Sequence, residues 1–121
     1  MTARLTGVPP GAHGFHIHEF GSCADLGKAA GGHYNPTNTP HGDVLKSGPH
    51  HAHVGDMGNI SANEKGEATL TATLKELTLS GAPHAIGGRA VILHEKEDDF
   101  SQPTGNAGGR IGCGTIVITS H

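Results

Sequence analysis

Short stretches in which apolar and polar residues alternate recur along the chain, and they predict β-strands. The clearest covers residues 12–20, where Phe15 and Ile17 alternate with His16 and His18. Because alternate side chains of a strand share a face, the two histidines point one way and the two apolar residues the other. At a rise of about 3.3 Å per residue, the two imidazoles stand about 7 Å apart. Further strands are predicted over residues 3–8, 54–60, 67–74, 89–94 and 111–119, with a shorter piece over 77–81.

Two long segments without this pattern separate the strands, residues 21–53 and residues 95–109. The first contains five histidines, the only tyrosine and one cysteine, and Gly-Gly, Asn-Pro and Gly-Pro pairs interrupt it. A loop of this length inside a compact domain is either functional or disordered, and we expect this one to be ordered by what it binds. Many short strands and turns, with no helical pattern, predict a single all-β domain over residues 1–121, a sandwich or a barrel.

Composition narrows the functional classes. The net charge is −3 with a pI near 6.4, which argues against nucleic acid or an anionic membrane as a partner. The sequence has no apolar run long enough to span a bilayer and does not open with a secretory signal peptide. Aromatic residues make up only 3%, so we expect a core of Val, Ile, Leu and Ala. Eleven scattered histidines are unusual for 121 residues, and histidine is the commonest metal ligand.

Four clusters of metal-ligating residue types are candidates for one centre. They are His16 with His18, His33 with His41, His53 with Asp56, and His94 at a strand end. Read alone, the His-x-His pattern is more often two exposed histidines on a half-buried strand than a metal site. Seven ligands exceed what one tetrahedral ion takes, whereas two ions that share a ligand would use them all. The only cysteines, Cys23 and Cys113, are either buried thiols or a disulfide that closes a long loop.

Five motifs in order resemble the copper/zinc superoxide dismutase family, over about residues 5–119. They are GFHIHEFG at 14–21, GHYNP at 32–36, HVGDMGN at 53–59, HEKEDD at 94–99 and TGNAGGR at 104–110. Carried over residue by residue, the resemblance implies copper on His16, His18, His33 and His94. It implies zinc on His33, His41, His53 and Asp56, with His33 between the two ions. His50 and His51 crowd His53, and we choose His53 because Asp56 follows it at the family's spacing.

The same resemblance implies roles around the metals. Asp98 matches a carboxylate that links His16 to His41, and the two cysteines match the family's intrasubunit disulfide. Arg110 matches the arginine beside the copper that attracts the anionic substrate, and Thr104 matches the threonine at the channel mouth. The implied activity is conversion of superoxide to dioxygen and hydrogen peroxide by Cu(II)/Cu(I) cycling, with zinc in a structural role. The competing hypotheses are a copper or zinc binding module without catalysis and an inactive structural relative. A copper-only enzyme is disfavoured by the intact His41, His53 and Asp56.

The beginning of the chain departs from the family pattern. The family's Greek-key β-sandwich, or flattened barrel, has two further strands and most of a third before Leu5. Without them, six apolar side chains are expected to face too little protein: Phe15, Ile17, Val91, Leu93, Ile116 and Ile118. We therefore expect a homo-oligomer, most simply a dimer. The spacing of His18 and Cys23 resembles bacterial members. A disulfide and this resemblance favour a periplasmic or extracellular location, and the chain alone leaves a cytoplasmic one open.

Overall fold

The computed structural model describes residues 1–73, 77–80 and 84–118. In this part of the chain, six strands form one antiparallel sheet: β1 (Thr2–Leu5), β2 (Gly11–His18), β3 (Asp56–Ala62), β4 (Ala68–Thr71), β5 (Ala90–His94) and β6 (Arg110–Thr115). Helical structure among the described residues is limited to two short turns, η1 (Lys28–Ala30) and α1 (Val44–Ser47). The all-β prediction is confirmed, and no helix among the described residues has the length and apolarity of a membrane span.

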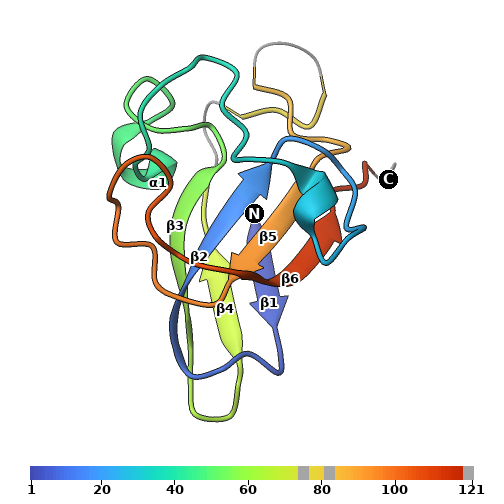
Figure 1. Ribbon diagram of the computed structural model, residues 1–121, viewed down its shortest axis with the longest axis vertical. Helices are drawn as coiled ribbons and strands as arrows, with labels where there is room; N and C mark the ends of the chain where they lie inside the picture. Colours follow the sequence, from blue (N-terminus) through green and yellow to red (C-terminus); the bar gives the residue numbers. More distant parts are fainter. Residues whose placement is uncertain (74–76, 81–83, 119–121) are drawn as a thin grey trace.

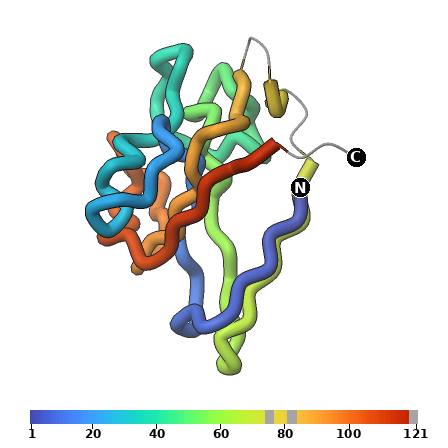
Figure 2. Tube along the Cα trace, turned by 90° about the vertical axis from the view of Figure 1, so that its right-hand side faces the viewer, coloured from blue at the N-terminus to red at the C-terminus, as the bar shows by residue number. Residues whose placement is uncertain are grey.

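The strand order is β1-β4-β3-β2-β5-β6, and the sheet curls into an open half-barrel (Figure 1). The neighbours β1–β4 and β2–β5 are not consecutive in sequence, as expected for the predicted Greek-key connections. β3 and β4 form a hairpin whose turn includes Asn63 and Gly66, and Gly66 adopts a φ of +80° that favours glycine. β1 and β6 are the two edge strands of the sheet. Figure 2 shows β1, in dark blue, and β6, in red, apart from each other.

One apolar cluster lies on the face of the sheet that carries Phe15 and Ile17. Phe15 and Ile17 from β2 and Ile60 from β3 are almost completely buried in it, at 3%, 0% and 1% exposure. The alternation predicted for β4 is also present, since Ala68 is buried while Thr69 and Thr71 are exposed. Curling of the sheet therefore covers much of the core with this chain alone.

The expectation that six apolar side chains would lack cover is wrong for three of them. Phe15, Ile17 and Leu93 are buried, whereas Val91 and Ile116 are half-buried and Ile118 is 53% exposed. Phe15, Ile17 and Leu93 are covered by the curl of the sheet, whereas Val91 of β5 lines the apolar pockets on its open side and Ile116 and Ile118 follow β6. β6 also ends at Thr115, earlier than predicted, and the predicted strand ends at 74, 81 and 119 lie outside the described residues.

Candidate metal centre

The candidate ligands come from three neighbouring strands and the long loop that follows β2. β2 supplies His16 and His18, which point away from the core as the alternation predicts, and β5 ends at His94. Asp56 begins β3 and lies opposite His16 in the sheet register. The loop supplies the other ligands, and an isolated bridge between His18 and His33 attaches it to β2. Segments far apart in sequence are thereby brought to one end of the sheet.

Two buried groups of four candidate ligands form there, and they share one histidine. In each group the ligand atoms lie within 4.8 Å of one another. The first group is His16, His18, His33 and His94, and the second is His33, His41, His53 and Asp56. All seven side chains predicted as ligands are thus brought together. His50 and His51 are exposed and belong to neither group.

In three histidines of the first group, one ring nitrogen is hydrogen-bonded and the other has no hydrogen-bond partner. The Nε2–H of His16 donates to Asp98 Oδ2 at 2.7 Å. The Nδ1–H groups of His18 and His94 donate to the carbonyls of Gly31 and Gly108, at 2.9 and 3.1 Å. The opposite nitrogens are buried and have no hydrogen-bond partner among the described residues. Buried polar atoms are seldom left unpaired, so three such nitrogens in one group fit a bound cation.

The second group has the dimensions of a tetrahedral metal site. His33 Nδ1 and His53 Nδ1 lie 3.0 and 3.1 Å from Asp56 Oδ1, and His41 Nδ1 lies 2.9 Å from Asp56 Oδ2. His41 Nδ1 nevertheless lacks hydrogen-bond geometry to any described residue. Ligands bound at 2.0–2.1 Å in a tetrahedron are about 3.3 Å apart, close to these separations. The backbone N–H groups of Gly42 and His53 donate to Asp56 Oδ2 at 2.8 and 2.9 Å and orient the carboxylate.

The Asp98 carboxylate accepts hydrogen bonds from one histidine of each ligand group, at the ring nitrogens opposite the candidate ligand nitrogens. Its Oδ2 accepts from His16, and both of its oxygens accept from His41 Nε2–H at 2.9 Å. The Asp98 side chain is fully buried. Asn59 of β3 holds its backbone with two hydrogen bonds, because Asn59 Oδ1 accepts from the Asp98 N–H at 2.7 Å and Asn59 Nδ2–H donates to its carbonyl at 3.0 Å. The carboxylate therefore fixes both rings with Nδ1 facing its ligand group.

Gly105 packs directly against this carboxylate. A Cβ at position 105 would collide with Asp98 Oδ1 and come within 2.7 Å of His41 Nε2. The backbone of Gly105 also has a φ of +86°, a conformation that side chains other than glycine rarely adopt. The glycine of the TGNAGGR motif is thus required by the close approach of the loop to the Asp98–His41 pair.

Burial and charge shift the ionisation of His18, His94 and the two carboxylates in directions that suit metal binding, and that of His41 in the opposite direction. Burial lowers the pKa of His18 to about 3 and that of His94 to about 4, so both rings are neutral near pH 7. The pKa of Asp56 and Asp98 is lowered, because their hydrogen bonds from histidines outweigh the burial that opposes ionisation. For His41, burial lowers the pKa, but the hydrogen bonds to Asp98 and the charge of the adjacent Asp56 outweigh it and raise the pKa to about 9, so His41 must release a proton when a metal binds. Neutral imidazoles and ionised carboxylates are the forms that bind metals.

The first group opens into a pocket of about 570 Å³. His18, His33 and His94 line it together with Thr104, Lys96 and Arg110, and the lining contains no acidic residue among the part of the chain that the structure describes. The guanidinium of Arg110 donates to the carbonyls of Gly27 and Gly31, each at 2.6 Å. Two cationic side chains at this opening favour a small anion.

A disulfide between Cys23 and Cys113 holds the ligand-bearing loop against β6, with Cα atoms 5.7 Å apart. Arg110 binds the same loop from the same strand, three residues before Cys113. The sequence left open whether these cysteines were thiols or a bridge, and the disulfide implied by the resemblance is present. His13, which lies on the core face of β2, is buried and bonded to the carbonyls of His94 and Pro9.

A family model described as copper/zinc superoxide dismutase (SODC) matches residues 1–116. The chain belongs to the copper/zinc superoxide dismutase family. A solved structure of the clock protein EA4 is 41% identical and superposes with a TM-score of 0.85, over 96% of this chain and 76% of that chain. The family resemblance inferred from five motifs is therefore confirmed, as is the fold class.

Proposed function

We propose that this protein is a superoxide dismutase with copper in the first group and zinc in the second. The observation that carries the proposal is the pairing of an accessible histidine group with a more enclosed one through His33. Bound copper would supply reversible Cu(II)/Cu(I) chemistry, through which two superoxide ions and two protons become dioxygen and hydrogen peroxide. An all-imidazole group suits copper, and a group that includes a carboxylate suits zinc.

The residues of the pocket are assigned separate tasks. His16, His18, His33 and His94 would hold the copper, and His33, His41, His53 and Asp56 would hold the zinc. The His33 nitrogen that faces the pocket would carry a proton only when it is not bound to copper. Arg110 attracts and orients the anion, and Thr104 lies at the opening, where it limits access to small ligands. These assignments follow the donor geometry and the family's pattern.

The test loads the purified chain with copper and zinc, measures both metals per chain, and assays superoxide dismutation on the same sample. We expect one ion of each metal and rapid dismutation, and we expect His33→Ala to abolish activity and to weaken both sites. A chain that binds both metals at full stoichiometry without dismutating superoxide would support a metal-binding function without catalysis. That alternative is specific, because the 41% identical relative is described as a clock protein.

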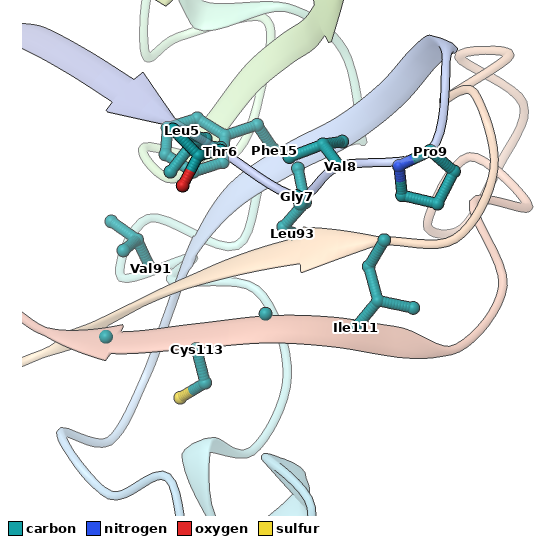
Figure 3. Close-up of a pocket in the computed structure, with 12 residues that line it drawn as sticks. Leu5, Thr6, Gly7, Val8, Pro9, Phe15, Val91, Leu93, Ile111 and Cys113 are labelled. Atoms are coloured by element: carbon teal, nitrogen blue, oxygen red, sulfur yellow. The ribbon is translucent and has the colours of Figure 1, made fainter. Parts of the chain in front are cut away.

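We also propose that a second copy of the chain covers the open side of the half-barrel. An apolar pocket of about 530 Å³ lies between β1 and β6 and is lined by residues such as Leu5, Phe15, Leu93 and Ile111 (Figure 3). A second apolar pocket of about 460 Å³ adjoins it and shares Val91. Together the two pockets are lined by 19 different residues, close to the 20–30 per side of a stable dimer.

Strand directions favour a twofold arrangement. Because neighbours alternate in direction through six antiparallel strands, β1 and β6 run in opposite directions. Rotation about an axis along the strands would place each β6 beside the other copy's β1 in antiparallel orientation, and both edges would pair. Light scattering during size exclusion is expected to give a dimer, and Ile111→Asp is expected to give a monomer. A parent chain that is monomeric at micromolar concentration and binds no hydrophobic dye would refute the proposal.

The disulfide supports a proposal about the compartment. Such bonds persist in oxidising surroundings and are rare where thiols are kept reduced. We therefore propose a periplasmic or extracellular location for the active protein.

A further inference from the structure

The loop between β5 and β6 contacts both the backbone and the ring of His41. The backbone N–H of His41 donates to Gln102 Oε1 at 2.9 Å, and Gln102 Nε2–H donates to the His41 carbonyl at 2.8 Å. This reciprocal pair joins residues 61 positions apart. Gln102 itself is exposed, so its side chain contributes nothing to the apolar core. His41 lies in a segment without regular secondary structure, and its backbone has no strand neighbour there to hold it.

The ring of His41 has a second contact with the same loop. The Phe100 ring is stacked on it, with centroids 6.4 Å apart and planes inclined by 20°. Phe100 adopts a φ of +63°, an unfavourable conformation for a large side chain, while its N–H donates to Asp98 Oδ1 at 2.9 Å. It also remains 39% exposed. Neither backbone preference nor burial accounts for phenylalanine at this position, whereas its contact with His41 does.

We propose that Gln102 and Phe100 are positioning residues that hold His41 in its metal-binding orientation and slow the loss of zinc. With Asp98 fixing Nε2, Gln102 fixing the backbone and Phe100 lying on the ring face, Nδ1 is directed at Asp56 and the second group. A ligand that is already oriented loses less freedom when the metal binds, and the metal escapes more slowly when that ligand cannot turn away. The inference rests on the proposed zinc assignment of this group.

Two substitutions separate positioning from general stabilisation. Gln102→Met keeps the length of the side chain and removes both hydrogen bonds. Phe100→Gly removes the ring and relieves the left-handed backbone, so the metal-free protein should be as stable as the parent or more stable. If Phe100 positions His41, zinc must nevertheless leave faster from this variant. A residue with a merely structural role would not give these opposite changes.

Ser101→Ala is the matched control, because Ser101 lies between the two residues and its hydroxyl bonds only within the loop, to Asp99 and Asn106. Gln102→Glu offers partial rescue, since it keeps an acceptor for the His41 N–H but cannot donate to the carbonyl. We expect its effect to lie between those of the parent and Gln102→Met.

The experiment uses the full chain loaded with copper and zinc and follows zinc release to an excess of a chelator. Gln102→Met is expected to release zinc about 10-fold faster, at the low end of the effects of residues that support metal ligands, and Phe100→Gly several-fold faster. Copper release should change less than twofold in each variant. With Co²⁺ in place of zinc, the visible absorption of a tetrahedral site should broaden or weaken in both variants and match the parent in Ser101→Ala.

The outcomes distinguish this inference from the proposed function. If the parent binds zinc and Co²⁺ tetrahedrally but both variants release zinc at its rate, the positioning roles are refuted and the zinc assignment stands. Equal acceleration in Ser101→Ala would also refute them, since general loosening of the loop would then be the cause. A parent that binds neither ion in this group would overturn the zinc assignment and the positioning roles together.

Discussion

Replacement of Asp98 by asparagine tests how far one carboxylate supports both metal groups. The substitution preserves size and changes two acceptor oxygens into one acceptor and one donor. Asp98 Oδ2 accepts from His16 at 2.7 Å, and both oxygens accept from His41 at 2.9 Å. With asparagine, an amide N–H group faces a ring N–H group on at least one side. That histidine must then turn or move its proton to Nδ1, which is the nitrogen facing the metal.

The size of the effect follows from these contacts. Each hydrogen bond to the buried charge contributes about 1.5–3 kcal/mol, and the side chain has no access to water. Loss of one such bond and weakening of another should destabilise the metal-free protein by about 3 kcal/mol. Loss of this kind of support typically reduces metal affinity 10–100-fold, and Asp98→Asn should do so in both groups at once.

Competition with chelators of known affinity would measure both metals, and urea unfolding would measure the stability of the metal-free chain. Asp99→Asn is the matched control, because the neighbouring Asp99 is exposed and accepts hydrogen bonds only within its own loop. If Asp98→Asn changes one affinity and leaves the other within twofold of the parent, the carboxylate does not couple the two groups, and the reasoning fails.

Three further expectations concern the pocket, the disulfide and pH. Arg110→Gln should slow dismutation about 10-fold with copper still bound and should remove most of the salt dependence of the rate; parent-like kinetics would exclude electrostatic attraction by Arg110. Reduction of Cys23–Cys113 should accelerate metal release, and thiol titration showing fully active protein with two free cysteines would contradict this. In the metal-free chain, the contribution of neutral His18 and His94 to stability should be complete above about pH 6.5, the ordinary pKa of histidine. It should be lost as pH falls through their lowered pKa values, about 3 and about 4, whereas the contribution of His41 should be lost as pH rises through its raised pKa of about 9; unfolding curves that coincide at pH 7 and pH 4 would refute this linkage.

Local patterns predicted the part of the centre that the sheet builds. Period-two alternation placed His16 and His18 opposite Phe15 and Ile17, and the structure has them so, because a strand imposes that geometry whatever surrounds it. The loop ligands are different, since nothing in the periodicity of residues 21–53 places His33 or His41 near β2. Residue type made them candidates for one centre, and the likeness to a family assigned them to its two sites.

The supporting contacts of the centre were beyond sequence reasoning. Gln102, Phe100 and Asn59 act through hydrogen bonds and a ring contact across 39 to 61 positions, and no local pattern encodes such separations. The short helix α1 was also missed, although Asp43 caps it by accepting from the Leu45 N–H at 3.0 Å. Four residues are too few for a helical period to be visible. The error about uncovered core residues has another cause, because strand patterns do not reveal how strongly a sheet curls.

β6 carries residues of both the open side of the half-barrel and the candidate metal centre. Most ligands lie on or beside the interior strands β2, β3 and β5, which have neighbours on both sides. β6 has one neighbour, yet it carries Arg110 and Cys113, and Ile111 between them lines the apolar pocket between β1 and β6. Fraying of β6 should therefore displace Arg110, which attracts the anion, before it displaces the metal ligands. Monomeric Ile111→Asp should keep parental copper and zinc contents but lose activity and salt dependence, as expected for Arg110→Gln. If it loses copper in proportion to its activity, β6 supports the ligands themselves, and this separation of edge from centre is wrong.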